Sequence, residues 1–324
     1  MVLLLPMINQ VSLRFFKGRE LWVDEPAKVF ISRTGRYVCY VNGDVVHVWD
    51  ANSGSQLASK ELGFKPSRDR IDCGSDALLI AGKKDILMFD LPNMSEILRV
   101  SGAHNKICSV KFTYDMKHIV SIGKDKVKVW SLNGALIRET DRVKCRSIAY
   151  DPEVELMAFR EKDDIILYDL RRGVDVASKR TYFIFHESIV KDEALMLINR
   201  HRFLICMDTV IDQGFDCDVL DIYSTEPIMP LVRIVLPSMF STIRYFPDRG
   251  IVIITNTHNI NYVLKLPSLE LRLIKITDSA LPETFPAAFD ATVMGDRIRI
   301  IGSVKEEDGE RLFVLDYKLH HDEP

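Results

Sequence analysis

The tetrapeptide Lys128-Val129-Trp130-Ser131 decides the fold, because variants of it recur along the whole chain. Each copy has alternating apolar residues, then an aromatic or large apolar residue, and usually a polar residue after it. The clear copies are His47-Val48-Trp49-Asp50, Leu87-Met88-Phe89-Asp90, Ile166-Leu167-Tyr168-Asp169 and Asp221-Ile222-Tyr223-Ser224, and the weaker ones are Tyr262-Val263-Leu264-Lys265 and Phe313-Val314-Leu315-Asp316. Alternation of this kind predicts half-buried β-strands.

The spacing of these copies predicts a repeated sheet. The large residues at positions 49, 89, 130, 168, 223, 264 and 315 are separated by 40, 41, 38, 55, 41 and 51 residues. Most of these gaps lie close to the period of a four-stranded propeller blade, which is about 40 residues. We therefore expect an all-β fold, a seven-bladed β-propeller of four-stranded antiparallel blades.

Turn-forming residues support the same register. A tight turn between the first and second strands is expected 14 residues before each anchor, where Gly, Pro, Asp or Ser should gather. Five units meet this expectation, at Gly35, Ser75, Met116, Val154 and Gly250. The fifth and seventh units fail it. They follow the two long gaps, so we expect loop insertions there.

The N-terminal segment is expected to supply the last strand. The seventh unit has three predicted strands, 288–293, 297–303 and 311–317, before the sequence ends. An unpaired edge would expose unsatisfied backbone groups, so residues 11–16 are predicted to complete this blade. The whole chain, 1–324, is then one propeller with blades near 27–60, 70–100, 104–140, 143–182, 188–235, 239–276 and 284–318.

Composition and charge exclude several classes of protein. The 324 residues are 47% hydrophobic and 27% charged, with a formal net charge of −3, so a core can be buried and there is no overall polybasic signal for nucleic acid. The apolar segment Met1–Ile8 is too short for a transmembrane segment and lacks the features of a signal peptide. Six scattered cysteines without a CxxC pair predict reduced thiols in a cytoplasmic or nuclear protein.

The third unit contains Gly102-Ala103-His104, followed by Ser121, Asp125 and Trp130. With these residues it resembles the WD-repeat (WD40) propeller family. In that family the matching residues form a buried hydrogen-bonded tetrad, so the resemblance implies a structural role for these side chains. Units five to seven depart from the signature because they lack the Gly-His pair and the tryptophan. Members of the family are mostly platforms for partner proteins, so the resemblance implies a non-enzymatic scaffold or adaptor.

Other motifs favour ordinary structural interpretations. His104 also has a catalytic interpretation, a His–Asp relay, but its spacing fits the tetrad better. Phosphate-binding glycine loops and HExxH, GxSxG and CxxC motifs are absent from the sequence, so we expect no enzyme activity, metal or cofactor. Asp212, Asp216 and Asp218 lack the glycine and glutamate of a calcium loop and are interpreted as a solvated acidic loop.

One tetrapeptide, Leu170-Arg171-Arg172-Gly173, matches the phosphoinositide-binding motif of the PROPPIN propellers. It directly follows Tyr168-Asp169, which places it between the third and fourth strands of its unit. In that family the motif comes after the fourth strand. An ordinary turn is therefore favoured, and a lipid role for the motif stays open.

Basic residues dominate the loops that join strand four to strand one, and strand two to strand three, in units two to four. Such loops share the top face of a propeller, and the same loops of units five and seven are acidic. The aromatic residues Trp22 and Phe64 are interpreted either as partner anchors or as packing residues. The partner-binding candidates are Phe64, Arg68, Arg70, Lys83, Lys84, Lys106, Lys124, Lys126, Arg142, Lys144, Arg146, Lys162 and Trp22.

The sequence therefore predicts a protein-interaction module that binds one or more charged protein partners on its top face, as part of a complex. The alternative is a peripheral module that binds anionic phosphates through the basic loops of blades two to four. Those phosphates would belong either to a phosphoinositide membrane or to RNA.

Overall fold

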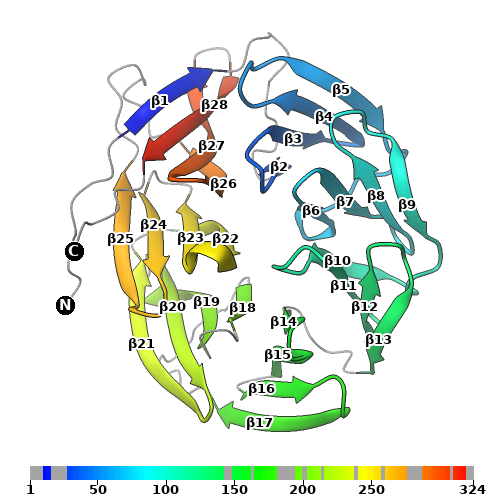
Figure 1. Ribbon diagram of the computed structural model, residues 1–324, viewed down its shortest axis with the longest axis vertical. Coiled ribbons are helices and arrows are strands. Elements are labelled where there is room, and N and C mark those ends of the chain that lie inside the picture. Colours follow the sequence, from blue (N-terminus) through cyan, green and yellow to red (C-terminus); the bar gives the residue numbers. More distant parts are fainter. Residues whose placement is uncertain are drawn as a thin grey trace. The chain divides into compact units, whose positions relative to one another are not determined.

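The computed structural model describes residues 10–15, 28–141, 148–161, 164–180, 194–198, 203–212, 215–236, 240–256, 260–275, 287–306 and 309–318. These residues form seven four-stranded sheets and contain no α-helix (Figure 1). Neighbouring strands pair antiparallel, as β10 to β13 do. The predicted fold class, an all-β fold with seven four-stranded blades, is confirmed.

The chain divides into two compact units. Unit 1 contains blades one, six and seven and most of blade two, and unit 2 contains blades three, four and five together with Lys83–Ile86. The strands of blades one and two are β2 (Val29–Ile31), β3 (Tyr37–Asn42), β4 (Val45–Asp50), β5 (Gln56–Glu61), β6 (Ile71–Cys73), β7 (Ala77–Ala81), β8 (Ile86–Asp90) and β9 (Glu96–Val100). The strands of blades six and seven are β22 (Phe240–Phe246), β23 (Ile251–Asn256), β24 (Ile260–Lys265), β25 (Glu270–Lys275), β26 (Ala287–Met294), β27 (Arg297–Glu306), β28 (Gly309–Lys318) and β1 (Gln10–Phe15).

Unit 2 has the same four-stranded pattern. Its strands are β10 (Ile107–Phe112), β11 (His118–Gly123), β12 (Val127–Ser131), β13 (Leu136–Thr140), β14 (Ile148–Asp151), β15 (Leu156–Glu161), β16 (Asp164–Asp169), β17 (Val174–Arg180), β18 (Ala194–Ile198), β19 (Phe203–Asp212), β20 (Phe215–Thr225) and β21 (Ile228–Leu236). Two short 3-10 turns, η2 (Arg68–Arg70) and η4 (Pro247–Arg249), lie in unit 1.

Blade seven is completed by the N-terminal strand. β1 pairs antiparallel with β28, with Leu13 opposite Leu315 and Phe15 opposite Phe313. The strand order β1-β28-β27-β26 makes β1 the fourth strand of this blade. The closing strand predicted over residues 11–16 is therefore confirmed, and it runs over Gln10–Phe15.

The five predicted turn positions all fall between the first and second strands of a blade. Gly35, Met116 and Gly250 have positive φ angles of 71°, 59° and 59°. In blade four the left-handed residue is Glu155, one position after the predicted one, with φ of 55°. Gly35 is also closely packed, because a Cβ atom there would lie 2.1 Å from the sulfur of Met294. Both conditions favour glycine at this turn.

Among the described residues, the extra length of blades five and seven lies in longer strands, so the prediction of loop insertions is wrong there. The segments before these blades, 181–193 and 276–286, lie outside the described residues. β19 and β20 have 10 and 11 residues, and β27 and β28 have 10 each. Asp212 lies opposite Phe215 at the end of a long hairpin, and Asp216 and Asp218 lie in β20. The ladder continues because β-branched residues such as Val210 lie among the acidic ones.

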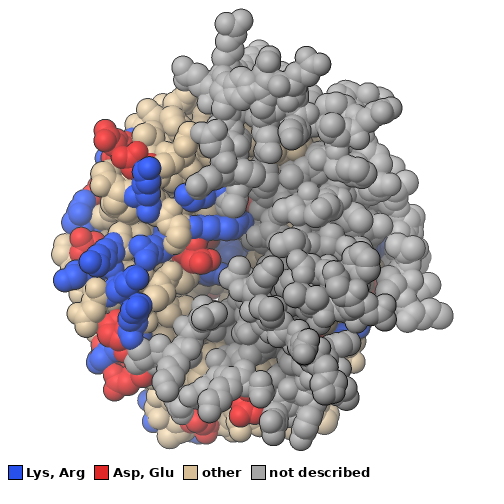
Figure 2. Space-filling view, turned by 180° about the vertical axis from the view of Figure 1, so that it is seen from behind, with Lys and Arg blue, Asp and Glu red and all other residues tan. Residues whose placement is uncertain are grey.

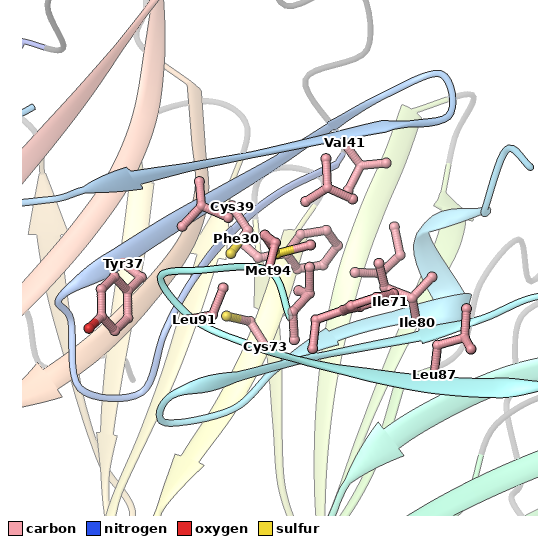
Figure 3. Close-up of a cluster of buried hydrophobic side chains, with 14 residues drawn as sticks. Phe30, Tyr37, Cys39, Val41, Ile71, Cys73, Ile80, Leu87, Leu91 and Met94 are labelled. Atoms are coloured by element: carbon pink, nitrogen blue, oxygen red, sulfur yellow. The ribbon is translucent and has the colours of Figure 1, made fainter. Parts of the chain in front are cut away.

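Hydrophobic side chains pack between neighbouring blades in each unit. In unit 1 one cluster joins blades one and two and includes Phe30, Val41 and Ile80 (Figure 3). In unit 2 a second cluster joins blades three and four, for example through Val129 and Tyr168. Tyr168, the large residue of its repeat, therefore lies where two blades meet. Each buried side chain of this size contributes about 1.5–3 kcal/mol to folding.

Buried ion pairs also link the blades of unit 1. Arg299 in β27 donates to both carboxylate oxygens of Asp316, at 2.6 and 2.8 Å, and to the carbonyl of Gly35 in blade one, at 2.7 Å. Arg244 in β22 pairs with Asp290 in β26 at 2.6 Å. Buried charges are tolerated when they are paired and hydrogen-bonded, so these contacts fix the edges of blades six, seven and one.

Candidate interaction surface

Three short segments of unit 2 carry most of the lysines that the sequence singled out and that the structure describes. They are the β7–β8 turn (residues 83–85), the β9–β10 loop (residues 101–106) and the β11–β12 turn (residues 124–126). We call these three segments the lysine loops. They hold five lysines and two aspartates. Figure 2 shows Lys and Arg side chains gathered on one face of the molecule, with Asp and Glu side chains among them.

A single peptide unit connects the three lysine loops. The N–H of Ile107 donates to the carbonyl of Lys83 at 2.8 Å. The carbonyl of Lys106, in the same peptide unit, accepts from the N–H of Lys124 at 2.9 Å. The C=O and N–H of a trans peptide point in opposite directions. The backbones of Lys83 and Lys124 therefore lie on opposite sides of the Lys106 backbone, and the order across the loops is fixed.

The two aspartates of the lysine loops accept hydrogen bonds from the backbone. Asp85 accepts the N–H of Gly102 at 2.8 Å. Asp125 accepts the N–H of Asn105 at 3.3 Å and the Nδ1–H of His104 at 2.8 Å. The carboxylates thus stabilise the loop conformation, and neither forms an ion pair with a lysine among the described residues.

The lysines fall into two groups. Lys126 pairs with Glu139, and with Asp141 at 3.4 Å, and the Glu139 contact raises the pKa of Lys126. Lys128, in the strand that follows, donates to the carbonyl of Ala103 at 2.6 Å. Four others are exposed, and within the described part of the chain none of them has a carboxylate partner: Lys83, Lys84, Lys106 and Lys124.

A buried hydrogen-bonded tetrad supports two of the lysine loops. The Nε1–H of Trp130 donates to Ser121 Oγ at 2.7 Å, and Ser121 Oγ lies 2.7 Å from His104 Nε2. His104 Nδ1 lies 2.8 Å from Asp125 Oδ1. An ionised carboxylate only accepts, so Nδ1 carries the proton and the Ser121 hydroxyl donates to Nε2. The tetrad joins β11 and β12 to the loop that carries Lys106.

The tetrad includes three side chains that are spaced like a catalytic triad, Ser121, His104 and Asp125. Unlike the residues of a catalytic triad, they are not accessible to a substrate. Ser121 is 0% exposed and His104 is 3% exposed, and the hydroxyl oxygen already receives the Trp130 N–H. Burial lowers the pKa of His104, although Asp125 acts in the opposite direction. Burial acts to raise the pKa of Asp125, but the hydrogen bond from His104 holds it below its ordinary value. A substrate cannot reach this serine, so the arrangement fits a structural network and not a nucleophilic one.

Gly123 is the residue whose substitution tests the tetrad most directly. A Cβ atom there would lie 2.2 Å from both Asp125 Oδ1 and His104 Nδ1. We expect Gly123→Ala to displace these side chains and lower the free energy of unfolding by about 1–3 kcal/mol, because buried polar groups lose partners. Urea unfolding, with the exposed Ser101→Ala as control, measures the effect. Equal stability of the two variants would contradict this account of the tetrad.

The remaining sequence candidates differ from the lysine loops. Phe64 is half-buried and packs against the cluster between blades one and two, so it is not a free aromatic anchor. Arg68 lies over the ring of Phe30 at 5.2 Å, and Arg70 is half-buried in η2. Five candidates lie outside the described residues: Trp22, Arg142, Lys144, Arg146 and Lys162.

The Leu170–Gly173 motif forms the turn between β16 and β17, as its position after Asp169 predicted. Arg171 donates Nε to Glu155 at 2.8 Å, and Arg172 lies 3.5 Å from Asp169. Both guanidinium groups thus have carboxylate partners in an exposed turn. Nothing in this geometry gathers them around a lipid phosphate.

The described residues form no metal site and no membrane-spanning helix. Among the described residues, no three His, Cys, Asp or Glu side chains are placed to hold a metal ion. The same residues include no helix that is both long and apolar enough to cross a membrane. Cys39, Cys73 and Cys108 are free thiols, and the first two are buried.

Comparisons with known proteins identify the fold. No protein-family model and no curated protein matches the sequence. The structure is similar to the WD40 domain of coronin from Toxoplasma gondii, with a TM-score of 0.65 and 14% identity over 99% of this chain and 90% of that one. It is also similar to a chain of the Mitotic Checkpoint Complex, with a TM-score of 0.53 and 15% identity over 77% of each chain. The likeness shows that the chain has the fold of a WD40 propeller.

Proposed function

We propose that this chain is a non-enzymatic interaction scaffold that binds a partner protein through the lysine loops, in the cytoplasm or the nucleus. The observation that carries the proposal is the set of four exposed lysines without described carboxylate partners, on loops that are hydrogen-bonded to one another. Fixed loops lose little conformational entropy on binding. Complementary charge on a partner then raises the rate of association and sets specificity. One structural neighbour was solved within a complex, which supports a role in an assembly.

The rival function is binding of anionic phosphates on a phosphoinositide membrane or on RNA, because lysines attract any polyanion. One observation weighs against RNA. The lysine loops contain no Phe, Tyr or Trp on which a base could stack.

Charge reversal of the lysine loops tests the proposal. In the triple variant Lys84→Glu, Lys106→Glu and Lys124→Glu, each change lowers the formal charge by two, from −3 to −9 in all. We expect stability to change by less than about 0.5 kcal/mol per substitution, because these side chains are exposed. Partner recovery in affinity capture, measured by quantitative mass spectrometry at two salt concentrations, should fall through slower association.

A second triple variant, Lys111→Glu, Lys117→Glu and Arg249→Glu, has the same net charge and is the matched control. These residues are exposed and lie outside the lysine loops. Arg33 is unsuitable as a control because it donates to the carbonyl of Tyr245 at 3.2 Å. The proposal fails if partners are lost from the control variant and retained by the lysine-loop variant.

A further inference from the structure

The lysines of the three loops lie in a row whose length is set by the hydrogen bonds between the loops. The backbones of Lys83, Lys106 and Lys124 lie in that order and are joined by hydrogen bonds of 2.8 and 2.9 Å through one peptide unit. Chains hydrogen-bonded side by side lie about 4.8 Å apart. The row from Lys83 to Lys124 therefore spans about 10 Å. Lys84 lies beside Lys83 in the same turn, and its carbonyl accepts the N–H of His104 in the middle loop at 3.3 Å.

Several backbone N–H groups of the lysine loops are already occupied. Gly102 and Asn105 donate to aspartates, and Ile107 and Lys124 donate to carbonyls of the neighbouring loops. A compact anion such as a phosphoryl group is commonly held by several N–H groups in one concave nest. These donors are not free to form such a nest. The exposed lysine side chains are therefore the main groups with which this surface can recognise a ligand.

We infer that the lysine loops bind an extended acidic segment of the partner protein, which crosses the loops in the order Lys83, Lys106 and Lys124. This inference rests on the proposed function and names the partner's chemistry. An extended chain rises about 3.3 Å per residue, and alternate side chains share a face about 6.6 Å apart. A row of about 10 Å thus faces about three or four residues of an extended chain, and two aspartates or glutamates at alternate positions lie within reach of its long, flexible lysine side chains.

The charge balance of the loops supports a carboxylate-rich ligand. Four lysines of the loops have no carboxylate partner among the described residues, and they outnumber the two aspartates, Asp85 and Asp125, so a local excess of positive charge remains. Carboxylates spread along a chain can pair with ammonium groups spread along a row. A single phosphoryl group needs those ammonium groups to converge on one point.

Binding of a defined peptide tests the inference with the full chain. The probe is a fluorescein-labelled octapeptide of alternating glutamate and serine, and its control has glutamine for each glutamate. We expect fluorescence anisotropy at low ionic strength to show binding of the glutamate peptide and none of the glutamine peptide. The variants Lys84→Ser, Lys106→Ser and Lys124→Ser should each weaken binding about two- to five-fold, as expected for single exposed ion pairs. Lys117→Ser, which removes an equal charge elsewhere, should leave the affinity unchanged.

Two further probes distinguish the outcomes. These are vesicles containing phosphatidylinositol phosphates and a single-stranded RNA. Binding of either in a lysine-dependent manner, without binding of the glutamate peptide, would overturn the inference. If the peptide fails while capture of the protein partner still depends on the lysines, the inference is wrong and the proposed function stands. If capture does not depend on the lysines, the proposed function itself is wrong.

Discussion

Deletion of residues 1–15 is expected to lower the melting temperature by about 10 °C or more and to cause aggregation. The deletion removes β1 and uncovers β28, whose residues Phe313, Val314 and Leu315 are buried. An uncovered strand exposes a row of unsatisfied N–H and C=O groups that can pair with another chain. With an unfolding entropy of about 2.1 cal/mol/K per residue, a shift of this size in a domain of this length corresponds to a loss of about 7 kcal/mol.

Differential scanning fluorimetry and light scattering measure the effect of this deletion. Deletion of residues 1–9 is the matched control, because it keeps all of β1 (Gln10–Phe15). The control should melt close to the full chain. A truncation at residue 15 that melts like the control would show that β1 contributes little to blade seven.

Trp130→Ala should be the most damaging single substitution in unit 2, with a loss of about 3–5 kcal/mol of unfolding free energy. Trp130 is 6% exposed, and its N–H is a donor to Ser121. The change both empties a large buried volume and removes a hydrogen bond from the tetrad. Trp130→Phe keeps a ring but not the donor, so we expect a smaller loss of about 1–3 kcal/mol. Urea unfolding of the two variants separates the effect of the emptied volume from that of the lost hydrogen bond. If the alanine variant loses less than about 0.5 kcal/mol of unfolding free energy, Trp130 has no structural role of this kind.

The blades could be predicted from the sequence because their signals are local. Trp130 and its counterparts stand in short alternating strands, and Gly35 and Gly250 are at turns that need a positive φ. The closing strand could be predicted because the last blade lacked one. The long hairpin of blade five could not be predicted in this way. Asp212 and Asp216 are typical of loops, and only their pairing between β19 and β20 shows them to be part of a ladder.

The lysine loops could be located from the sequence, but the sequence could not show which of their lysines have carboxylate partners. Lys124 and Lys126 both flank Asp125, yet only Lys126 has carboxylate partners among the described residues. Its partner Glu139 comes from β13, and the register between β12 and β13 that places it there is a property of the folded sheet. Packing of Phe64 against the blade-one and blade-two cluster is non-local in the same way.

The pairing of β1 with β28 also sets the order of events during synthesis. Phe15 leaves the ribosome about 300 residues before its partner Phe313. At about 5–20 residues per second this interval lasts about 15–60 s, and throughout it β1 has no strand to pair with. Contacts so distant in sequence also form slowly, because a long loop must close first. We therefore expect blade seven to be the last to assemble and the nascent chain to be most vulnerable to aggregation just before that step.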